Sequence, residues 1–267
     1  RSLKFQRPAL RLAQQTLPNG CYSEYAYNAA NQLVGLANKN AADAVLASYG
    51  TMQYLGTGDL ATVTSTIPGA TSLAGVVDYA YDRKRQLTLE DSDRSGGYDF
   101  ANAFDGAGNA TTFRDGAQTF NADNQLTGTG YVYDGNGNPT TFGGTTLTFD
   151  VENRLTAYGT ALTAGYRGDS LRAWKESTAG RTYFLYDGIR IVGELDADGD
   201  LIAASTYGAA GLLSRGTTQY QFDPLGDAVL LLDGSGTVTG SRLFDAWGNE
   251  LAAVAEPYGY RAQHGYY

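Results

Sequence analysis

A short phrase of residues recurs nine times along this chain and constrains its fold more than any other feature. Each copy has an aromatic residue followed by Asp or Asn, then a polar turn, often closed by a pair such as Gln-Leu or Gly-Asn. A phrase repeated this often is a building unit of a repetitive architecture and not a catalytic motif. The copies are marked by the pairs Tyr27-Asn28, Tyr81-Asp82, Phe104-Asp105, Phe120-Asn121, Tyr133-Asp134, Phe149-Asp150, Tyr186-Asp187, Phe222-Asp223 and Phe244-Asp245.

Each copy predicts a β-hairpin. Tyr131 and Tyr133 are two residues apart, so their side chains lie on one face of an extended strand. The turn at residues 134–138 consists of Asp, Asn and Gly, which bond their own backbone or tolerate positive φ. Residues 140–142 then supply β-branched and aromatic side chains for a returning strand. Because one hairpin cannot bury its aromatic face alone, neighbouring hairpins must pair or stack.

The chain is therefore expected to be all-β: a strip of repeated hairpins that curls into a β-solenoid or a segment of a shell. Its 35 Gly and 20 Tyr in 267 residues fit many tight turns that join aromatic-bearing strands. Residues 29–49, rich in Ala, Asn and Leu, are the one stretch in which a helical turn or two remains an alternative. The residues expected to hold the repeats together by cross-strand packing and turn chemistry are Tyr27, Tyr81, Asp82, Tyr133, Asp134, Phe149, Asp150, Tyr186, Asp187, Phe222, Asp223, Phe244 and Asp245.

Charge argues against a nucleic-acid partner, and hydropathy argues against a membrane-spanning segment. The net charge is −9, and the four basic residues before the first acid leave −13 on residues 12–267. An acidic body argues against nucleic acid, which requires clustered Lys and Arg. The longest strongly apolar run, residues 228–232, is far too short to span a membrane. No initiator Met or hydrophobic leader is visible, so the sequence is interpreted as a processed or excerpted piece.

No catalytic or metal site is expected. Asp196, Asp198 and Asp200 have the spacing of the first three calcium ligands of an EF-hand, but Leu and Tyr stand where that loop needs Gly and Glu. His264 is the only histidine and Cys21 the only cysteine, which excludes a multi-His metal site and an internal disulfide. Trp174 and Trp247 are the best candidates for stacking on a sugar, although packing roles are the simpler interpretation.

The repeated phrases resemble the YD repeats of the Rhs and YD-repeat family. That family includes the C component of bacterial toxin complexes and the shell region of teneurins. The resemblance is most specific near the C-terminal end, where four segments match the Rhs-associated core in order. These segments are residues 183–199, 222–234, 244–249 (FDAWGN) and 257–267 (PYGYRAQHGYY).

The resemblance covers roughly residues 76–267 and implies three parts. These are degenerate repeats or a docking segment at 1–75, YD repeats at 76–180 and a partial Rhs-associated core at 181–267. In this family the strip spirals into a hollow shell around a toxic C-terminal domain, and in several members the core plugs the shell and cleaves the chain. The sequence stops before the family's self-cleavage motif, so no catalytic residue is carried over and no enzyme activity is expected. A chain of this length is expected to form an arc, not a closed container.

Two functions remain open at this point. The first is a secreted or cell-surface bacterial shell segment that encloses and helps deliver a toxin or other polypeptide cargo. Its partners would be the rest of a larger shell polypeptide and that cargo, with no cofactor. The second is an extracellular β-solenoid for adhesion, glycan binding or filament assembly, whose partners would include copies of itself, because an unclosed strip exposes strand edges.

Overall fold

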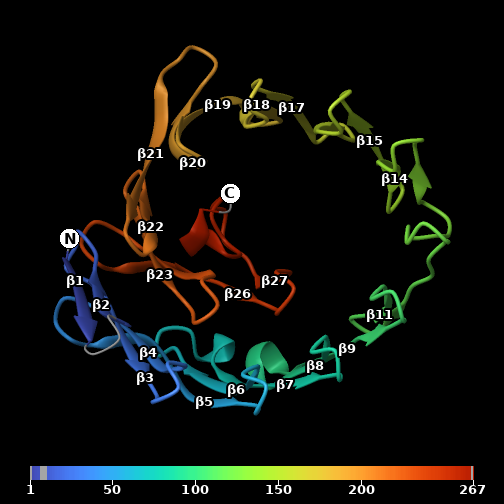
Figure 1. Cartoon of the computed structure of the whole chain (residues 1–267). Coiled ribbons are helices and arrows are strands. Elements are labelled where there is room, and N and C mark those ends of the chain that lie inside the picture. The colour runs from blue at the N-terminus through green and yellow to red at the C-terminus, as the bar shows by residue number, and fades with distance from the viewer. Residues whose placement is uncertain (1, 7–10, 266) are drawn as a thin grey trace. The chain divides into compact units, whose positions relative to one another are not determined.

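The computed structural model describes residues 2–6, 11–265 and 267 (Figure 1). The described chain is all-β, which confirms the predicted fold class. Its helices are three single 3-10 turns, η1 (Thr71–Leu73), η2 (Arg94–Gly96) and η3 (Ala262–His264). No helix among the described residues is long and apolar enough to cross a membrane. Two compact units are present: unit 1 combines Arg1–Ala101 with Thr206–Tyr267, and unit 2 is Asn102–Ser205.

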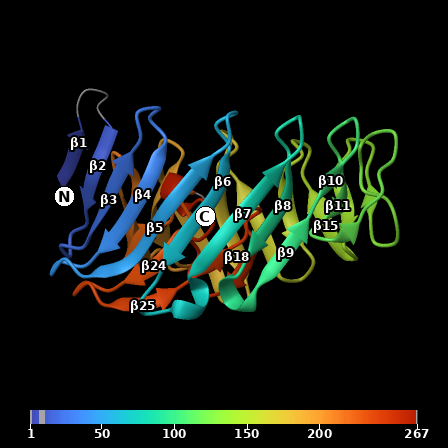
Figure 2. The same cartoon turned by 90° about the horizontal axis from the view of Figure 1, so that it is seen from below.

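Unit 1 is built on a nine-stranded antiparallel sheet, in which each strand pairs with the next one along the chain (Figure 2). Alternation along the strands sends Leu36, Tyr49, Val63 and Val77 to one buried face, which we call the core face. The strands are β1 (Ser2–Gln6), β2 (Arg11–Thr16), β3 (Tyr22–Tyr27), β4 (Leu33–Lys39), β5 (Val45–Tyr54), β6 (Leu60–Thr66), β7 (Gly75–Tyr81), β8 (Leu87–Ser92) and β9 (Tyr98–Ala101).

The helical alternative for residues 29–49 is wrong. This stretch forms β4 and the first half of β5. Leu36 and Asn38 are buried, as are Ala47 and Tyr49, whereas the residues between each pair are half-buried. A period of two places each second side chain on the core face, and that burial outweighs the helix propensity of the alanines.

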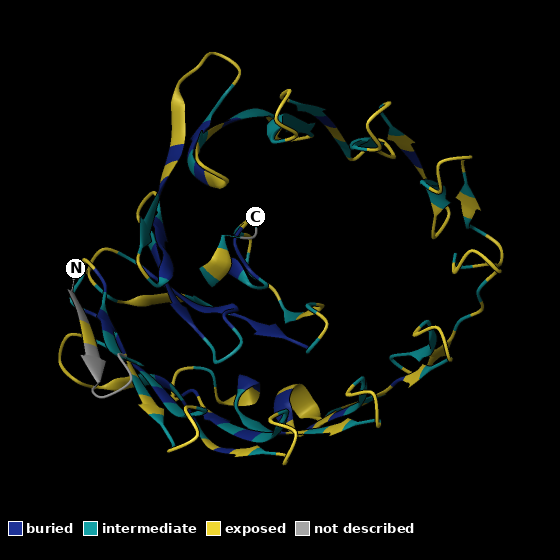
Figure 3. Ribbon diagram, in the orientation of Figure 1, coloured by how far each residue is buried: buried dark blue, intermediate teal, exposed yellow. Residues whose placement is uncertain are grey.

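Residues 206–267, here called the C-terminal segment, pack on the core face within unit 1. Val229, Leu230 and Leu243 belong to the same hydrophobic cluster as Leu36 and Tyr49. Figure 3 shows much of the segment in dark blue, and its strand β24 is buried along its whole length. The segment contains β22 (Gly211–Arg215), β23 (Thr218–Phe222), β24 (Ala228–Leu232), β25 (Val238–Ser241), β26 (Leu243–Phe244) and β27 (Glu250–Ala252).

Unit 2 continues the succession of antiparallel hairpins with far less burial. Among its described residues the buried hydrophobic side chains are Leu147, Ala164, Phe184, Ile191 and Ala203. The three-part division at residues 75 and 180 rests on repeat type and remains a prediction. The strands are β10 (Ala103–Phe104), β11 (Ala110–Phe113), β12 (Gly116–Ala117), β13 (Val132–Tyr133), β14 (Pro139–Phe142), β15 (Thr145–Phe149), β16 (Leu155–Tyr158), β17 (Leu162–Tyr166), β18 (Arg172–Ser177), β19 (Gly180–Asp187), β20 (Arg190–Leu195) and β21 (Leu201–Gly208), which ends in unit 1.

Candidate functional site

In all but one of the nine repeats, the Asp or Asn caps a five-residue turn. Asp134 Oδ1 accepts hydrogen bonds from the backbone N–H groups of Asn136 and Asn138, both at 2.9 Å. The backbone closes the same turn, since Asp134 N donates to the Asn138 carbonyl at 2.9 Å. A carboxylate or amide oxygen thus accepts the N–H groups for which a tight turn has no main-chain acceptor. The same side-chain geometry occurs at Asn28, Asn40, Asp82, Asp105, Asn121, Asp150, Asp196, Asp223, Asp233 and Asp245.

Replacing Asp134 with Ala should lower the melting temperature of unit 2, because two backbone N–H groups lose their acceptor. Asp134→Asn is the matched control and should melt close to the wild type, since Asn fills this position at residues 28, 40 and 121. The turn hydrogen bonds lower the pKa of Asp134, so its contribution should disappear as the pH falls through that lowered pKa. Thermal unfolding followed by Trp174 fluorescence in a Trp247→Phe background measures the effect, and equal melting of the two variants would contradict the cap.

A β-bulge precedes the aromatic anchors. The register shifts immediately before Tyr27, Tyr81, Tyr133 and Phe149, and the same shift precedes Phe222. A bulge bends its strand and increases the local right-handed twist. The repeat therefore introduces a bend once in each hairpin, which an alternating pattern alone did not predict. The further anchors preceded by a bulge are Phe104, Tyr166, Tyr186 and Phe244.

Anchor tyrosines also tie one hairpin to the one before it. The hydroxyl of Tyr81 donates to the carbonyl of Leu60 at 2.9 Å, and the hydroxyl of Tyr54 donates to the carbonyl of Leu33 at 2.6 Å. In unit 2, the hydroxyl of Tyr166 bonds the Leu155 carbonyl in the same way. Each bond ends at the first residue of a strand one hairpin earlier. The hydroxyl therefore adds a specific link to the packing of the ring.

Tyr81→Phe should lower the free energy of unfolding of unit 1 by about 0.5–1.5 kcal/mol, the usual net worth of one hydrogen bond. The ring and its packing are retained, and Phe serves as the anchor at residues 149, 222 and 244. Tyr81→Leu, which removes the ring as well, should cost more. Urea unfolding of both variants measures the two contributions. An unchanged free energy of unfolding for Tyr81→Phe would show that the hydroxyl contributes nothing, and equal losses for the two variants would show the same of the ring.

The predicted anchors differ in burial and in role. Phe222 and Phe244 are buried, whereas Tyr27, Tyr133 and Phe149 are half-buried. Asp187 is the exception among the predicted acids, because it lies in β19 and pairs with Arg190 across a two-residue turn. The sequence analysis missed two caps of the same kind, Asn40 and Asp233, because no aromatic residue precedes them. A cap residue followed by a five-residue polar turn was the signal that could have identified both.

The C-terminal segment is fastened to the sheet by polar contacts at main-chain atoms. The central one is Glu90 of β8, whose side chain is fully buried. Glu90 Oε2 accepts from the N–H of Ala246 at 2.8 Å, and Glu90 Oε1 accepts from the hydroxyl of Tyr98 at 3.0 Å. Arg94 Nη2 completes the group at 3.4 Å from Glu90 Oε1. The other contacts are Asn38 Nδ2 to the Phe222 carbonyl, Asn19 Nδ2 to the Asp233 carbonyl, and Gln221 Nε2 to the carbonyls of Tyr22 and Lys39.

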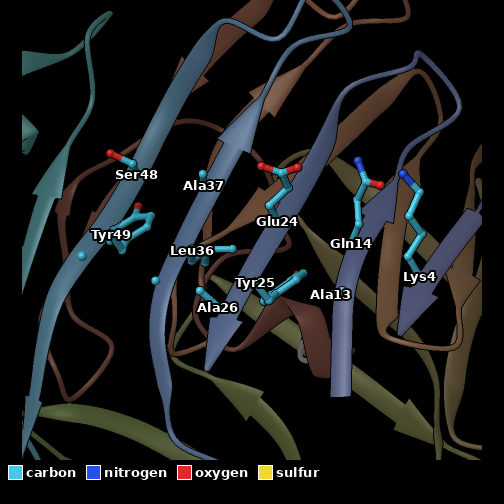
Figure 4. A pocket seen from close by; sticks show the side chains of 12 residues that line it. Lys4, Ala13, Gln14, Glu24, Tyr25, Ala26, Leu36, Ala37, Ser48 and Tyr49 are labelled. Atoms are coloured by element: carbon cyan, nitrogen blue, oxygen red, sulfur yellow. The ribbon is translucent and has the colours of Figure 1, made fainter. Parts of the chain in front are cut away.

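The face of the sheet opposite the core face carries a shallow trough of about 560 Å³ (Figure 4). Its side chains include a row in direct register across neighbouring strands. Small residues form much of the lining, and one Lys and one Glu are its charged groups. The row consists of Lys4, Gln14, Glu24, Ala37 and Ser48.

The remaining candidates have structural surroundings. Asp196 Oδ1 accepts the N–H groups of Asp198 and Asp200, as in the other turns. In the described part of the chain, no group of three acidic, His or Cys side chains could hold a metal ion. Cys21 is buried, and this burial raises the pKa of its thiol. The guanidinium of Arg181 covers the ring of Trp174 at 4.2 Å from its centroid.

Comparisons with known proteins show the fold of this chain. No family model matches it, and no curated protein does. Among solved structures it is similar to the Tc holotoxin pore of Photorhabdus luminescens, with 14% identity and a TM-score of 0.71. It is also similar to the TcdB2–TccC3 crystal structure (15%, TM-score 0.71) and to the TcdB2–TccC3–Cdc42 crystal structure (15%, TM-score 0.73). Each match covers 98% of this chain and 16% of the other chain, so this chain spans about a sixth of the length of the chains it matches.

Proposed function

We propose that this chain is a segment of an Rhs-like YD-repeat shell that encloses a polypeptide cargo and helps to deliver it. The observation that carries the proposal is the similarity of fold over 98% of the chain to chains of Tc toxin complexes. Its partners would be the rest of a larger shell polypeptide and a toxin cargo, and its location would be secreted or at the cell surface. It would act by containment and not by turnover.

The construction of the repeat supports this role. Capped turns, bulges and hydroxyl links recur along the strip, so each hairpin is fixed to its neighbours by several small contributions, about 0.5–1.5 kcal/mol for each net hydrogen bond. Unit 1 adds a second layer, because the C-terminal segment covers the core face of its sheet. A wall that must exclude solvent and proteases from a cargo requires this kind of repeated, local reinforcement.

The mass of the natively purified particle, measured beside the denatured mass of the chain, tests the proposal. A shell segment should be found in a particle that also contains other or longer polypeptides. A native mass equal to one chain would contradict containment. An open-ended series of identical copies would contradict it too and would favour the adhesive or filament-forming solenoid.

A further inference from the structure

In four of the capped turns the side chain of the fifth residue returns a hydrogen bond to the cap. In these turns the cap's Oδ1 accepts two backbone N–H groups, and its Oδ2 accepts a side-chain donor from the residue four positions on. The donor stabilises the charged carboxylate by a charge-assisted hydrogen bond and fixes its orientation. The pairs are Asn109 to Asp105 (2.9 Å), Asn138 to Asp134 (2.9 Å), Arg154 to Asp150 (2.7 Å) and Asn249 to Asp245 (2.9 Å).

The turn at residues 223–227 has an acid in place of such a donor. Asp223 Oδ1 accepts the N–H groups of Leu225 and Asp227 as usual, at 2.9 and 3.0 Å. The fifth residue, however, is Asp227, a second carboxyl group where the repeat has a donor. Asp227 is only 1% exposed, and its Oδ1 accepts the N–H of Arg261 at 2.7 Å. A buried acid, next to the half-buried Asp223, therefore stands where four other turns have a side-chain donor.

This turn lies where the C-terminal segment meets the core face. A small cavity of about 20 Å³, room for roughly one water molecule, is lined by Asp223, Asp245, Arg94 and Tyr49. Four carboxyl groups, Glu90 among them, and two guanidinium groups gather around the contact, so full ionisation would leave uncompensated negative charge. The titratable and charged groups that face the pair are Tyr49, Tyr79, Glu90 and Arg94 from the sheet, and Asp245, Arg261 and His264 from the C-terminal segment.

Burying this charge raises the pKa of the carboxyl groups. Burial, with the neighbouring Asp223 carboxylate, raises the pKa of Asp227 to about 8, while the N–H and guanidinium of Arg261 act in the opposite direction. Burial also raises the pKa of Asp223 and of Glu90. At neutral pH the pair therefore holds a proton.

We propose that the turn at residues 223–227 is a proton-dependent latch between the C-terminal segment and the core face. A proton held by this pair of acids takes the place of the side-chain donor found in four other turns, and loss of that proton loosens the turn from the sheet. This inference goes beyond the proposed function and does not depend on it, because it concerns only contacts within unit 1.

The chain contains its own control for the latch. The turn at residues 196–200 has the same arrangement of acids, with Asp196 as the cap and Asp200 as the fifth residue. Both of its ends are solvent-accessible and Asp200 is exposed, whereas Asp227 is buried. Asp200→Asn and Asp227→Asn therefore make the same chemical change in an exposed and a buried copy of one turn. Asn is an ordinary residue at this position, as at 109, 138 and 249.

Hydrogen–deuterium exchange of peptides covering residues 220–246, from about pH 5 to pH 9 and corrected for the intrinsic chemistry of exchange, tests the latch. In the closed turn the pair of acids keeps its proton, because burial raises the pKa of Asp227. In the open turn the same group is in water, has its ordinary lower pKa and loses the proton, so raising the pH favours opening. The opening equilibrium should increase about tenfold per pH unit up to about pH 8 and then level off. Asp227→Asn should abolish this dependence, whereas Asp200→Asn should leave it unchanged.

Either of two outcomes would overturn the latch. One is a wild-type opening equilibrium that does not change with pH, and the other is a pH dependence that survives in Asp227→Asn. If Asp227→Asn does not fold, Asp223→Asn gives the same decision, because Asn retains the capping oxygen and removes the charge. It too should flatten the pH dependence.

Discussion

Replacing Glu90 with Ala should lower the free energy of unfolding of unit 1 by about 3–5 kcal/mol, the cost of removing one partner from a buried ion pair. Glu90 is fully buried, and Arg94 is 8% exposed. The variant would leave the Arg94 guanidinium without its carboxylate partner and the N–H of Ala246 without an acceptor. The bond to Ala246 joins residues 156 positions apart in the chain, so its loss weakens the docking of the C-terminal segment directly.

Urea unfolding in a Trp174→Phe background measures this effect, because Trp247 is then the only tryptophan and lies in unit 1. Glu90→Gln should give a smaller loss, since an amide oxygen can still accept from Ala246. Asp91→Ala is the matched surface control, because Asp91 is the next residue of β8 and its side chain is exposed. Asp91 lies in register between Asp78 and Asp99, so its removal should leave stability unchanged or raise it slightly. A loss for Asp91→Ala as large as that for Glu90→Ala would contradict the role given to the buried pair.

The turns and strands that depend only on neighbouring residues could be predicted from the sequence. The turn at residues 134–138 and the strands on either side of it follow from five consecutive turn-forming residues between alternating ones, and the structure has them. The helical alternative for residues 29–49 arose because Ala favours helices. It was wrong because the stretch gains more from alternate burial of side chains such as Leu36 and Tyr49, which no local pattern measures.

The contacts that fasten unit 1 could not be predicted in this way. Glu90 looks like any other acid in a polar stretch, and its burial depends on Ala246 arriving from the far end of the chain. Asp223 was predicted as a repeat acid, yet its pairing with a buried Asp227 depends on the packing of the C-terminal segment. The sequence did contain one signal. The fifth residue of the turn at 223–227 is an acid, whereas residues 109, 138, 154 and 249 at the same position of other turns carry side-chain donors.

Tyr220→Ala should lower the free energy of unfolding of unit 1 by about 3–5 kcal/mol, the range for removing a buried aromatic side chain. Tyr220 is 1% exposed, and its ring lies 6.4 Å from that of Phe222 and 6.1 Å from that of Tyr258, measured between centroids. These rings belong to the second hydrophobic cluster of unit 1, which holds the C-terminal segment together. Loss of the ring leaves a cavity that the surrounding strands cannot fill without moving.

The hydroxyl of Tyr220 should contribute separately. It donates to Glu256 Oε1 at 2.6 Å, and the side chain of Glu256 is only 8% exposed, with Arg215 Nη1 3.8 Å from its other oxygen. Tyr220→Phe retains the ring but removes a donor from this carboxylate, so it should cost about 1.5–3 kcal/mol, the range for a hydrogen bond to a charged group. Tyr22→Phe is the control, because the hydroxyl of Tyr22 bonds the exposed side chain of Asp43 and should matter little. If Tyr220→Ala and Tyr220→Phe destabilised unit 1 equally in the Trp174→Phe background, the packing of the ring would carry none of the effect. The aromatic cluster would then not be what holds the C-terminal segment together.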